Sequence, residues 1–124
     1  MINIAIVEDE KLYVSQFKEY ISRYEKESGN RINVSVFPDG ADFDIILMDI
    51  QMKYMDGMTA AEQIRKLDSE VIIMFITNMT QYAIRGYEVD ALDYVVKPVE
   101  YFSFSQKLDR AIGRLQNKKK VFVS

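Results

Sequence analysis

The sequence contains neither cysteine nor histidine. Without cysteine the chain can form no disulfide and no thiolate metal site, and this composition fits a reducing cytosol. Without histidine it lacks the commonest protein ligand for metals and the commonest acid–base catalyst. Any metal binding or catalysis by this chain would therefore have to use other side chains.

Long apolar runs are also lacking. The longest uninterrupted one, Val71 to Ile76, is far shorter than the roughly 20 residues that span a bilayer. The first residues lack the basic region and apolar stretch of a signal peptide. The formal net charge of -3 argues against a basic face of the kind that binds nucleic acid. We therefore expect a soluble cytoplasmic protein whose 124 residues form one domain.

Short apolar runs alternate with stretches of helical periodicity along the chain. Runs rich in β-branched residues predict buried strands, whereas apolar residues three or four positions apart predict amphipathic helices. The predicted strands are residues 2–7, 32–37, 44–48, 71–76 and 93–96, and the predicted helices are residues 12–28, 58–67, 80–88 and 100–117. This order predicts an α/β fold with a five-stranded parallel sheet, doubly wound so that helices cover both faces.

One connection is too short for this pattern. Only residues 38–43 separate the strand that ends at Phe37 from the strand that begins at Asp44. A parallel crossover normally takes a dozen or more residues, usually a helix. Either the second crossover helix is absent because residues are missing between Phe37 and Asp44, or the native connection is unusually short. We favour missing residues, because a bare sheet face would expose apolar surface.

Polar residues follow the predicted strands at the points where they end. Glu8 and Asp9 follow the first strand, Asp49 the third, Thr77 the fourth and Lys97 the last. Ligands of open parallel sheets bind beyond the carboxyl ends of the strands. A cluster of carboxylates there is unfavourable unless a cation joins it. We therefore predict a Mg²⁺ site, since Mg²⁺ prefers hard oxygen ligands.

Asp49 is the best candidate nucleophile, because it ends the most apolar central strand. An ionised carboxylate can accept a phosphoryl group as an aspartyl phosphate. The hydroxyl of Thr77 and the ammonium of Lys97 could then bind the phosphoryl oxygens. The residues thus predict phosphoryl transfer to a carboxylate.

In this order and spacing the motifs resemble those of a response-regulator receiver domain over nearly the whole chain. Each motif is weak by itself, but together they are specific. The matching segments are residues 7–10 (VEDE), 47–52 (LMDIQM), 56–57 (DG), 76–77 (IT) and 93–98 (DYVVKP). The resemblance implies a flavodoxin-like fold with strand order 2-1-3-4-5. It also implies two-component signalling, in which a sensor histidine kinase donates a phosphoryl group to Asp49.

The resemblance implies the ligands of the Mg²⁺ ion. Asp9, Asp49 and the backbone carbonyl of Gln51 would bind it, and Glu8 would assist directly or through a water molecule. Glu8 stands where the family commonly has Asp, which lengthens the arm toward the metal.

The resemblance also implies a switch. Thr77 would be the switch hydroxyl, Tyr94 the switch aromatic, and Lys97 the phosphoryl clamp, followed by a cis peptide bond to its proline. Two residues depart from the family pattern. Asn78 replaces a usual Ala or Gly beside the site, and Lys53 replaces a usual Pro in the loop after the phosphoacceptor.

Two further segments are similar to receivers of the LytTR type, whose partner domain binds DNA through β-strands. These segments are residues 82–84 (YAI) and 91–94 (ALDY). Residues 118–124 (KKKVFVS) look like a linker into the first strand of such a domain. We therefore expect a receiver at residues 1–117 and a linker at 118–124, with DNA bound only through a C-terminal domain outside this chain. A homodimer would fit this transcriptional output.

Two other functions would use some of the same residues. The alternative is a stand-alone receiver that acts as a phosphotransfer or protein-binding module without DNA output. A Mg²⁺-dependent phosphohydrolase is a poor fit, because Gln51 stands where a second acid–base carboxylate is needed and no cap insertion exists. We therefore expect no enzyme. Glu8, Asp9 and Glu10 could also be mere helix N-terminal carboxylates, but that would not explain Asp49.

Overall fold

The fold is a five-stranded parallel sheet with helices on both faces. The computed structural model describes residues 1–36, 42–52, 56–78 and 93–123, with side chains up to Asn117. The strands are β1 (Ile2–Val7), β2 (Ile32–Val36), β3 (Ile45–Asp49), β4 (Ile72–Thr77) and β5 (Asp93–Val96). Their order is β2-β1-β3-β4-β5, and every neighbouring pair is parallel. The predicted sheet and strand order are confirmed.

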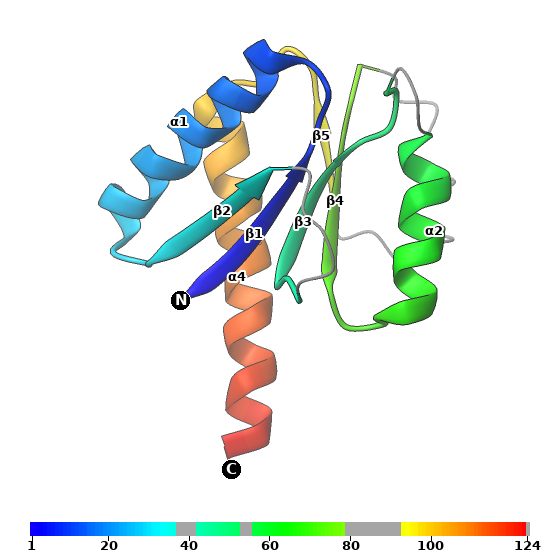
Figure 1. Cartoon of the computed structure of the whole chain (residues 1–124). Coiled ribbons are helices and arrows are strands. Elements are labelled where there is room, and N and C mark those ends of the chain that lie inside the picture. The colour runs from blue at the N-terminus through cyan, green and yellow to red at the C-terminus, as the bar shows by residue number, and fades with distance from the viewer. Residues whose placement is uncertain (37–41, 53–55, 79–92, 124) are drawn as a thin grey trace.

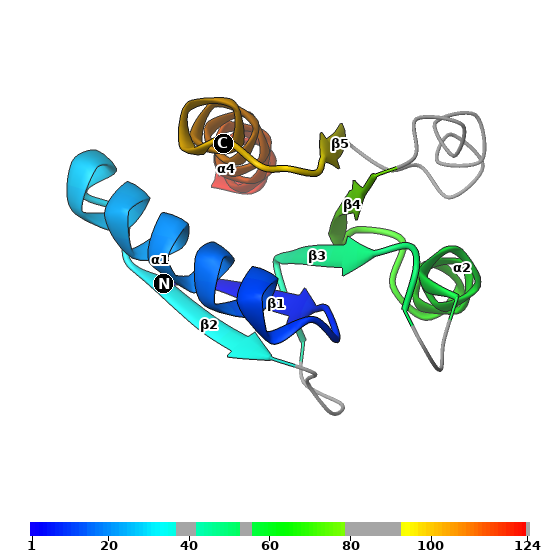
Figure 2. The ribbon, with the colours of Figure 1, turned by 90° about the horizontal axis from the view of Figure 1, so that it is seen from above.

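Three described helices cover the sheet. Figure 2 shows α1 (Lys11–Ser28) and α4 (Tyr101–Val123) on one side of the sheet and α2 (Gly57–Leu67) on the other. This arrangement confirms the doubly wound fold. The helix predicted at residues 80–88 lies outside the described residues, as do the segments 82–84 and 91–92. None of the described helices has the length and apolar character needed to cross a membrane.

The core consists of two apolar clusters, one on each face of the sheet. Successive side chains of a strand point to opposite faces, so each central strand contributes to both clusters. One cluster joins Ile4 to Phe17 of α1 and Phe104 of α4. The other joins Phe75 to Met58 of α2. Strands β1, β3 and β4 are therefore buried almost throughout, whereas β2 is half-buried at the edge of the sheet.

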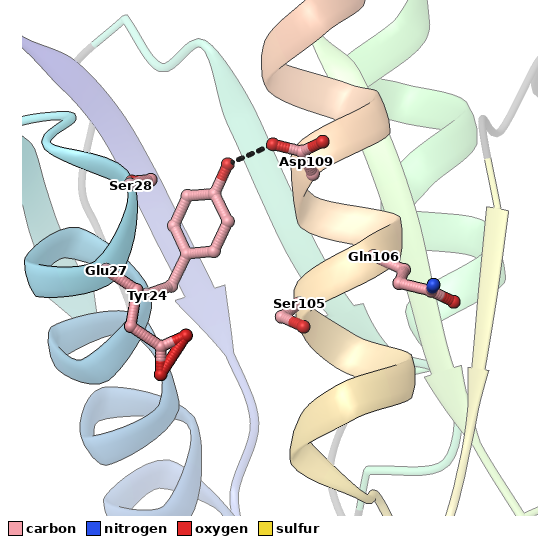
Figure 3. A pocket seen from close by; sticks show the side chains of 6 residues that line it. All are labelled: Tyr24, Glu27, Ser28, Ser105, Gln106 and Asp109. Atoms are coloured by element: carbon pink, nitrogen blue, oxygen red, sulfur yellow. Dashed lines mark hydrogen bonds between the residues drawn. The ribbon is translucent and has the colours of Figure 1, made fainter.

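A part-buried hydrogen bond joins α1 to α4. The Tyr24 hydroxyl donates to Asp109 Oδ1 over 2.8 Å (Figure 3). Burial and the Asp109 carboxylate raise the pKa of Tyr24 to about 12, so the hydroxyl keeps its proton at neutral pH. Tyr24 and Asp109 line an open hollow of about 220 Å³, and its other lining residues are Glu27, Ser28, Ser105 and Gln106. The two helices are thus fixed relative to each other by a directional contact as well as by apolar packing.

The C-terminal end of α1 lies where the sequence predicts it, whereas that of α4 does not. Helix α1 ends at Gly29, whose positive φ of 78° is the left-handed conformation that glycine adopts most readily. Helix α4 continues to Val123, six residues beyond the predicted end at Asn117. In Figure 1 its last turns extend past the sheet. The predicted linker segment therefore begins as a continuation of α4.

The edge strand β2 has polar side chains on the face that points away from α1 and α4. Ile32, Val34 and Val36 of β2 pack toward α1 and α4, so the alternating Asn33 and Ser35 point to the opposite face. The Asn33 side-chain amide donates there to Asn3 Oδ1 over 3.2 Å. Ala5 and Val7 of the neighbouring strand β1 lie on this same face and are apolar. Residues 37–41 of the connection lie outside the described residues, so the absence of residues between Phe37 and Asp44 stays a prediction.

Phe104 should carry a large share of the packing between α4 and α1. It is 0% exposed, and its ring lies 5.8 Å from that of Phe17 and 5.6 Å from that of Tyr20. Phe104→Ala should lower the free energy of unfolding by about 3–5 kcal/mol, measured by denaturant titration. The matched control is Phe102→Ala, at a side chain that is 70% exposed, which should change it by less than about 0.5 kcal/mol. Equal effects of the two substitutions would contradict this account of the core.

Candidate functional site

The carboxyl ends of four strands bring the predicted polar residues together. In the register Val7 pairs with Met48, Asp49 with Ile76, and Thr77 with Val96. Glu8, Asp49, Thr77 and Lys97 therefore lie along one edge of the sheet, each at or just past the end of its strand. The convergence predicted from the sequence is confirmed by this geometry.

Lys97 lies between two buried carboxylates. Its Nζ is 3.2 Å from Glu8 Oε2 and 3.7 Å from Asp49 Oδ1. Glu8 is 0% exposed and Asp49 1% exposed. Buried charges are tolerated when they are paired, so the ammonium stabilises two carboxylates that would otherwise repel each other.

The acidic cluster has the donor set of a hard-cation site. One carboxylate oxygen from each of Glu8, Asp9 and Asp49 lies within 4.8 Å of the others. Asp49 Oδ1 accepts the Gln51 N–H over 3.3 Å, and Glu8 Oε1 accepts the Glu10 N–H over 3.0 Å. Among the described residues, the second oxygen of Asp49, Oδ2, is buried and accepts no hydrogen bond, whereas Glu8 Oε2 faces the Lys97 ammonium. A buried carboxylate oxygen such as Asp49 Oδ2 is suited to Mg²⁺, which takes carboxylate ligands.

The electrostatics of Asp49 and Lys97 are coupled. Burial, together with the nearby Glu8 charge, raises the pKa of Asp49 to about 7, although Lys97 acts in the opposite direction. Partial burial tends to lower the pKa of Lys97, but Asp49 and Glu8 outweigh it and the pKa is raised above its ordinary value. The site therefore holds a firmly protonated lysine beside a carboxyl group that ionises near neutral pH, and a bound cation would favour the ionised form.

The other predicted site residues lie near Asp49 and Lys97. Thr77 is buried, and its backbone carbonyl accepts the Lys97 N–H over 2.8 Å. The Tyr94 ring lies 5.6 Å from Phe75 on the α2 face of the sheet. The Lys97–Pro98 peptide bond is cis, as the resemblance implied. Gln51 lies next to Asp49, but the role of its carbonyl as a metal ligand stays a prediction, as do the switch roles of Thr77 and Tyr94.

A cavity opens beside Lys97. Its volume is about 360 Å³, and it is lined by Glu10, Tyr13, Gln51, Asn78, Lys97 and Pro98. Asn78, which departs from the family pattern, is therefore part of the wall beside the site. A phosphoryl donor approaching Lys97 through this cavity would meet that side chain. Lys53 lies outside the described residues.

Two residues of the site were not given a role from the sequence. Gly57 begins α2, and its N–H donates to the Ile50 carbonyl over 2.9 Å. A Cβ atom there would lie 1.9 Å from the backbone oxygen of Asp49. The Asp56–Gly57 pair was a usable signal, because glycine permits close backbone approach. Tyr13 stacks its ring under Lys97, and nothing in its helical spacing distinguished it from a core residue.

The contact at Gly57 predicts that this residue positions Asp49. Gly57→Ala should lower the free energy of unfolding by about 1–3 kcal/mol, because the methyl group must displace the Asp49 backbone or the start of α2. Gly113→Ala is the matched control, since nothing lies within 4 Å of a Cβ there. That change should stabilise α4 by about 0.5–1 kcal/mol. Denaturant titrations of both variants test this, and a neutral Gly57→Ala would refute the close approach.

The raised pKa of Asp49 predicts a pH-dependent stability. The folded state binds a proton at Asp49 up to a pH of about 7, whereas the unfolded state loses it near 3.8. Stability from this group is therefore lost as the pH rises through that interval. In chelator-treated buffer, Asp49→Asn should become progressively more stable than the wild type as the pH rises, and the gain should level off above about 7.

The control for this measurement is Mg²⁺. Saturating Mg²⁺ should stabilise the wild type more than Asp49→Asn, because a ligand stabilises the state that binds it. The difference in the free energy of unfolding between the two proteins should therefore become smaller. Thermal unfolding across the pH series provides the readout. A constant difference at every pH would show that Asp49 does not titrate in this interval.

Sequence relatives cover most of the chain. The family described as the response regulator receiver domain matches residues 4–109. The chain is 30% identical to the sensory transduction protein LytT of Bacillus subtilis (strain 168) over 115 residues. This alignment covers 89% of this chain and 48% of LytT. Over 120 residues the chain is 31% identical to the transcriptional regulatory protein YpdB of Escherichia coli (strain K12), covering 87% and 48% of the two chains. The chain thus spans about half the length of these relatives.

A solved structure shares the fold. The response regulatory domain of protein mrkE from Klebsiella pneumoniae superposes with a TM-score of 0.81, covering 94% of this chain and 99% of that one at 24% identity. This likeness supports the fold, while the sequence match over residues 4–109 supports the family. Both agree with the cluster of Glu8, Asp9, Asp49 and Lys97 at the carboxyl edge of the sheet. The chain belongs to the response regulator receiver domain family.

Proposed function

We propose that this chain is a phosphorylation switch in which Asp49 accepts a phosphoryl group from a sensor histidine kinase. The observation that carries the proposal is the pairing of Asp49 with Lys97. Asp49 is buried, one of its oxygens accepts no hydrogen bond from the part of the chain that the structure describes, and the Lys97 ammonium lies 3.7 Å from its other oxygen. A carboxylate nucleophile beside a cation that can bind phosphoryl oxygens is the arrangement that aspartyl phosphate formation requires.

The chemistry needs positioning and charge stabilisation more than acid–base catalysis. The Asp49 carboxylate would attack phosphorus, forming a P–O bond while the P–N bond to the donor histidine breaks, and the electron pair stays on the imidazole nitrogen. Lys97 and the Thr77 hydroxyl would bind the transferred oxygens. Asp9 and Asp49, with Glu8 and the Gln51 carbonyl, would hold Mg²⁺, which would neutralise charge on the transferred group. The chain would thus be a signalling module and not an enzyme acting on small substrates.

The switch would act on the surface formed by β5 and α4. Thr77 and Lys97 would move toward the phosphoryl group, and Tyr94, which packs against Phe75, would follow Thr77. Phosphorylation can shift the population only if it stabilises one surface arrangement over another. Tyr94 lies on β5 next to Asp93, and the Asp93 carboxylate pairs with Arg110 of α4 over 3.2 Å. A movement of Tyr94 would therefore change the contacts between β5 and α4.

The output would be dimerisation and control of an attached DNA-binding domain. Asp93, Lys107 and Arg110 place charges of both signs on the β5–α4 surface, and such charges can pair across a two-fold axis. The relatives LytT and YpdB are about twice as long as this chain, and YpdB is named a transcriptional regulatory protein. Together with the LytTR-like segments, these matches favour transcriptional output from the cytoplasm over a stand-alone receiver. Helix α4, continuing to Val123, would lead into the output domain.

Phosphorylation by acetyl phosphate tests the switch. Intact mass spectrometry of the wild type should show one added phosphoryl group, and only when Mg²⁺ is present. Asp49→Ala should show none, because it removes the nucleophile but leaves Glu8, Asp9 and Lys97 in place. Light scattering of the same samples should show a mass increase toward a dimer only in the phosphorylated wild type.

Each outcome of this experiment decides one part of the proposal. An adduct that persists in Asp49→Ala would place the acceptor elsewhere. Absence of any adduct would overturn the phosphorylation switch and leave a receiver that signals by binding alone. A phosphorylated protein that stays monomeric would overturn the dimer and leave the phosphoacceptor standing.

A further inference from the structure

The Lys97 ammonium touches an aromatic ring as well as two carboxylates. Its Nζ lies 4.1 Å from the centroid of the Tyr13 ring, within the range of a cation–π contact. Tyr13 lies in the first turns of α1, which follows directly on Glu8, Asp9 and Glu10. The ring and Lys97 both line the cavity beside the site. Tyr13 is therefore placed where it can hold the lysine from the solvent side of the carboxylates.

The Tyr13 ring is itself fixed by the core. It stacks on Phe17 with the ring centroids 6.0 Å apart, and Phe17 stacks on Phe104 at 5.8 Å. Phe17 and Phe104 are both fully buried. The support under Lys97 is thus a row of rings anchored in the α1–α4 core, and it does not depend on a mobile surface side chain.

We propose that Tyr13 is a positioning residue, whose ring holds the Lys97 ammonium at the mouth of the site and so accelerates phosphoryl uptake by Asp49. This inference rests on the proposed phosphorylation switch. A free lysine side chain has many rotamers, and fixing one of them costs conformational entropy. A ring that restrains Lys97 before the donor arrives removes part of that cost from the reaction.

The ring contact differs from the two ion pairs in one respect. The attraction of Glu8 and Asp49 for Lys97 weakens when a bound cation offsets the charges of the two carboxylates. The attraction of the Tyr13 ring comes from its quadrupole and is independent of those charges. Tyr13 therefore continues to hold Lys97 when the carboxylates are otherwise engaged, which is when the clamp must act.

Substitutions at Tyr13 separate the ring from the hydroxyl. Tyr13→Leu removes the ring but keeps an apolar side chain on Phe17, and it should slow phosphorylation by acetyl phosphate by about three- to tenfold. Tyr13→Phe keeps the ring and should remain within about twofold of the wild type. Tyr101→Leu is the matched control, because it also removes an aromatic ring from a cation: the Tyr101 ring lies 3.9 Å from the Arg23 guanidinium. Tyr101 contacts Tyr20, which in turn contacts Phe104, so its ring belongs to the same aromatic group but lies away from Lys97. That variant should not alter the rate.

Nuclear magnetic resonance of the Lys97 side chain provides a second readout that does not require phosphorylation. Ring-current shifts of the Lys97 methylene protons should be present in the wild type and in Tyr13→Phe, and absent in Tyr13→Leu. Thermal unfolding confirms that each variant is folded. The proposal is overturned if Tyr13→Phe is as slow as Tyr13→Leu, or if the Lys97 shifts survive in Tyr13→Leu. If the wild type takes up no phosphoryl group, the proposed function fails, while the shifts still decide whether the contact exists.

Discussion

The ammonium of Lys97 between the buried carboxylates of Glu8 and Asp49 is the interaction on which the rest of this structure depends. Two buried carboxylates this close together would repel each other and take up protons. The lysine makes their burial tolerable at distances of 3.2 and 3.7 Å. Because Asp49 still ionises only near neutral pH, the balance is incomplete. A further cation would therefore stabilise the ionised carboxylates of this site, and binding of that cation could change the conformation around them.

The same strand register serves the core and the site. Residues that alternate between the two apolar clusters fix the strands relative to one another, and a slip of one residue would turn every side chain to the other face. The register that buries Leu47 and Met48 also places Asp49 beside the ends of β1 and β4. Gly57 then brings α2 against the Asp49 backbone. The position of Asp49 is thus a consequence of core packing on both faces.

Prediction from the sequence was accurate where local patterns carried the information. The apolar run Ile2–Val7 predicts a strand, and the structure has β1 there. Gly29 follows the end of α1, because the residue at that position adopts the left-handed backbone conformation. It was less accurate where a pattern is ambiguous. The lysines at 118–120 are compatible both with the end of a helix and with its continuation, and α4 continues through them. The polar Asn33 and Ser35 were visible in the sequence, but their shared face became evident only once β2 was paired with β1.

The sequence by itself determined the order of the elements, the residues that end the strands and the family to which they point. These features depend on periodicity and on motif spacing, which are properties of neighbouring residues. Only the tertiary structure decided that Lys97 contacts Glu8, Asp49 and the Tyr13 ring together, and that Gly57 touches the Asp49 backbone. Those contacts join residues far apart in the chain. Their existence depends on sheet register and helix packing, because local sequence preferences do not specify which side chains meet across elements.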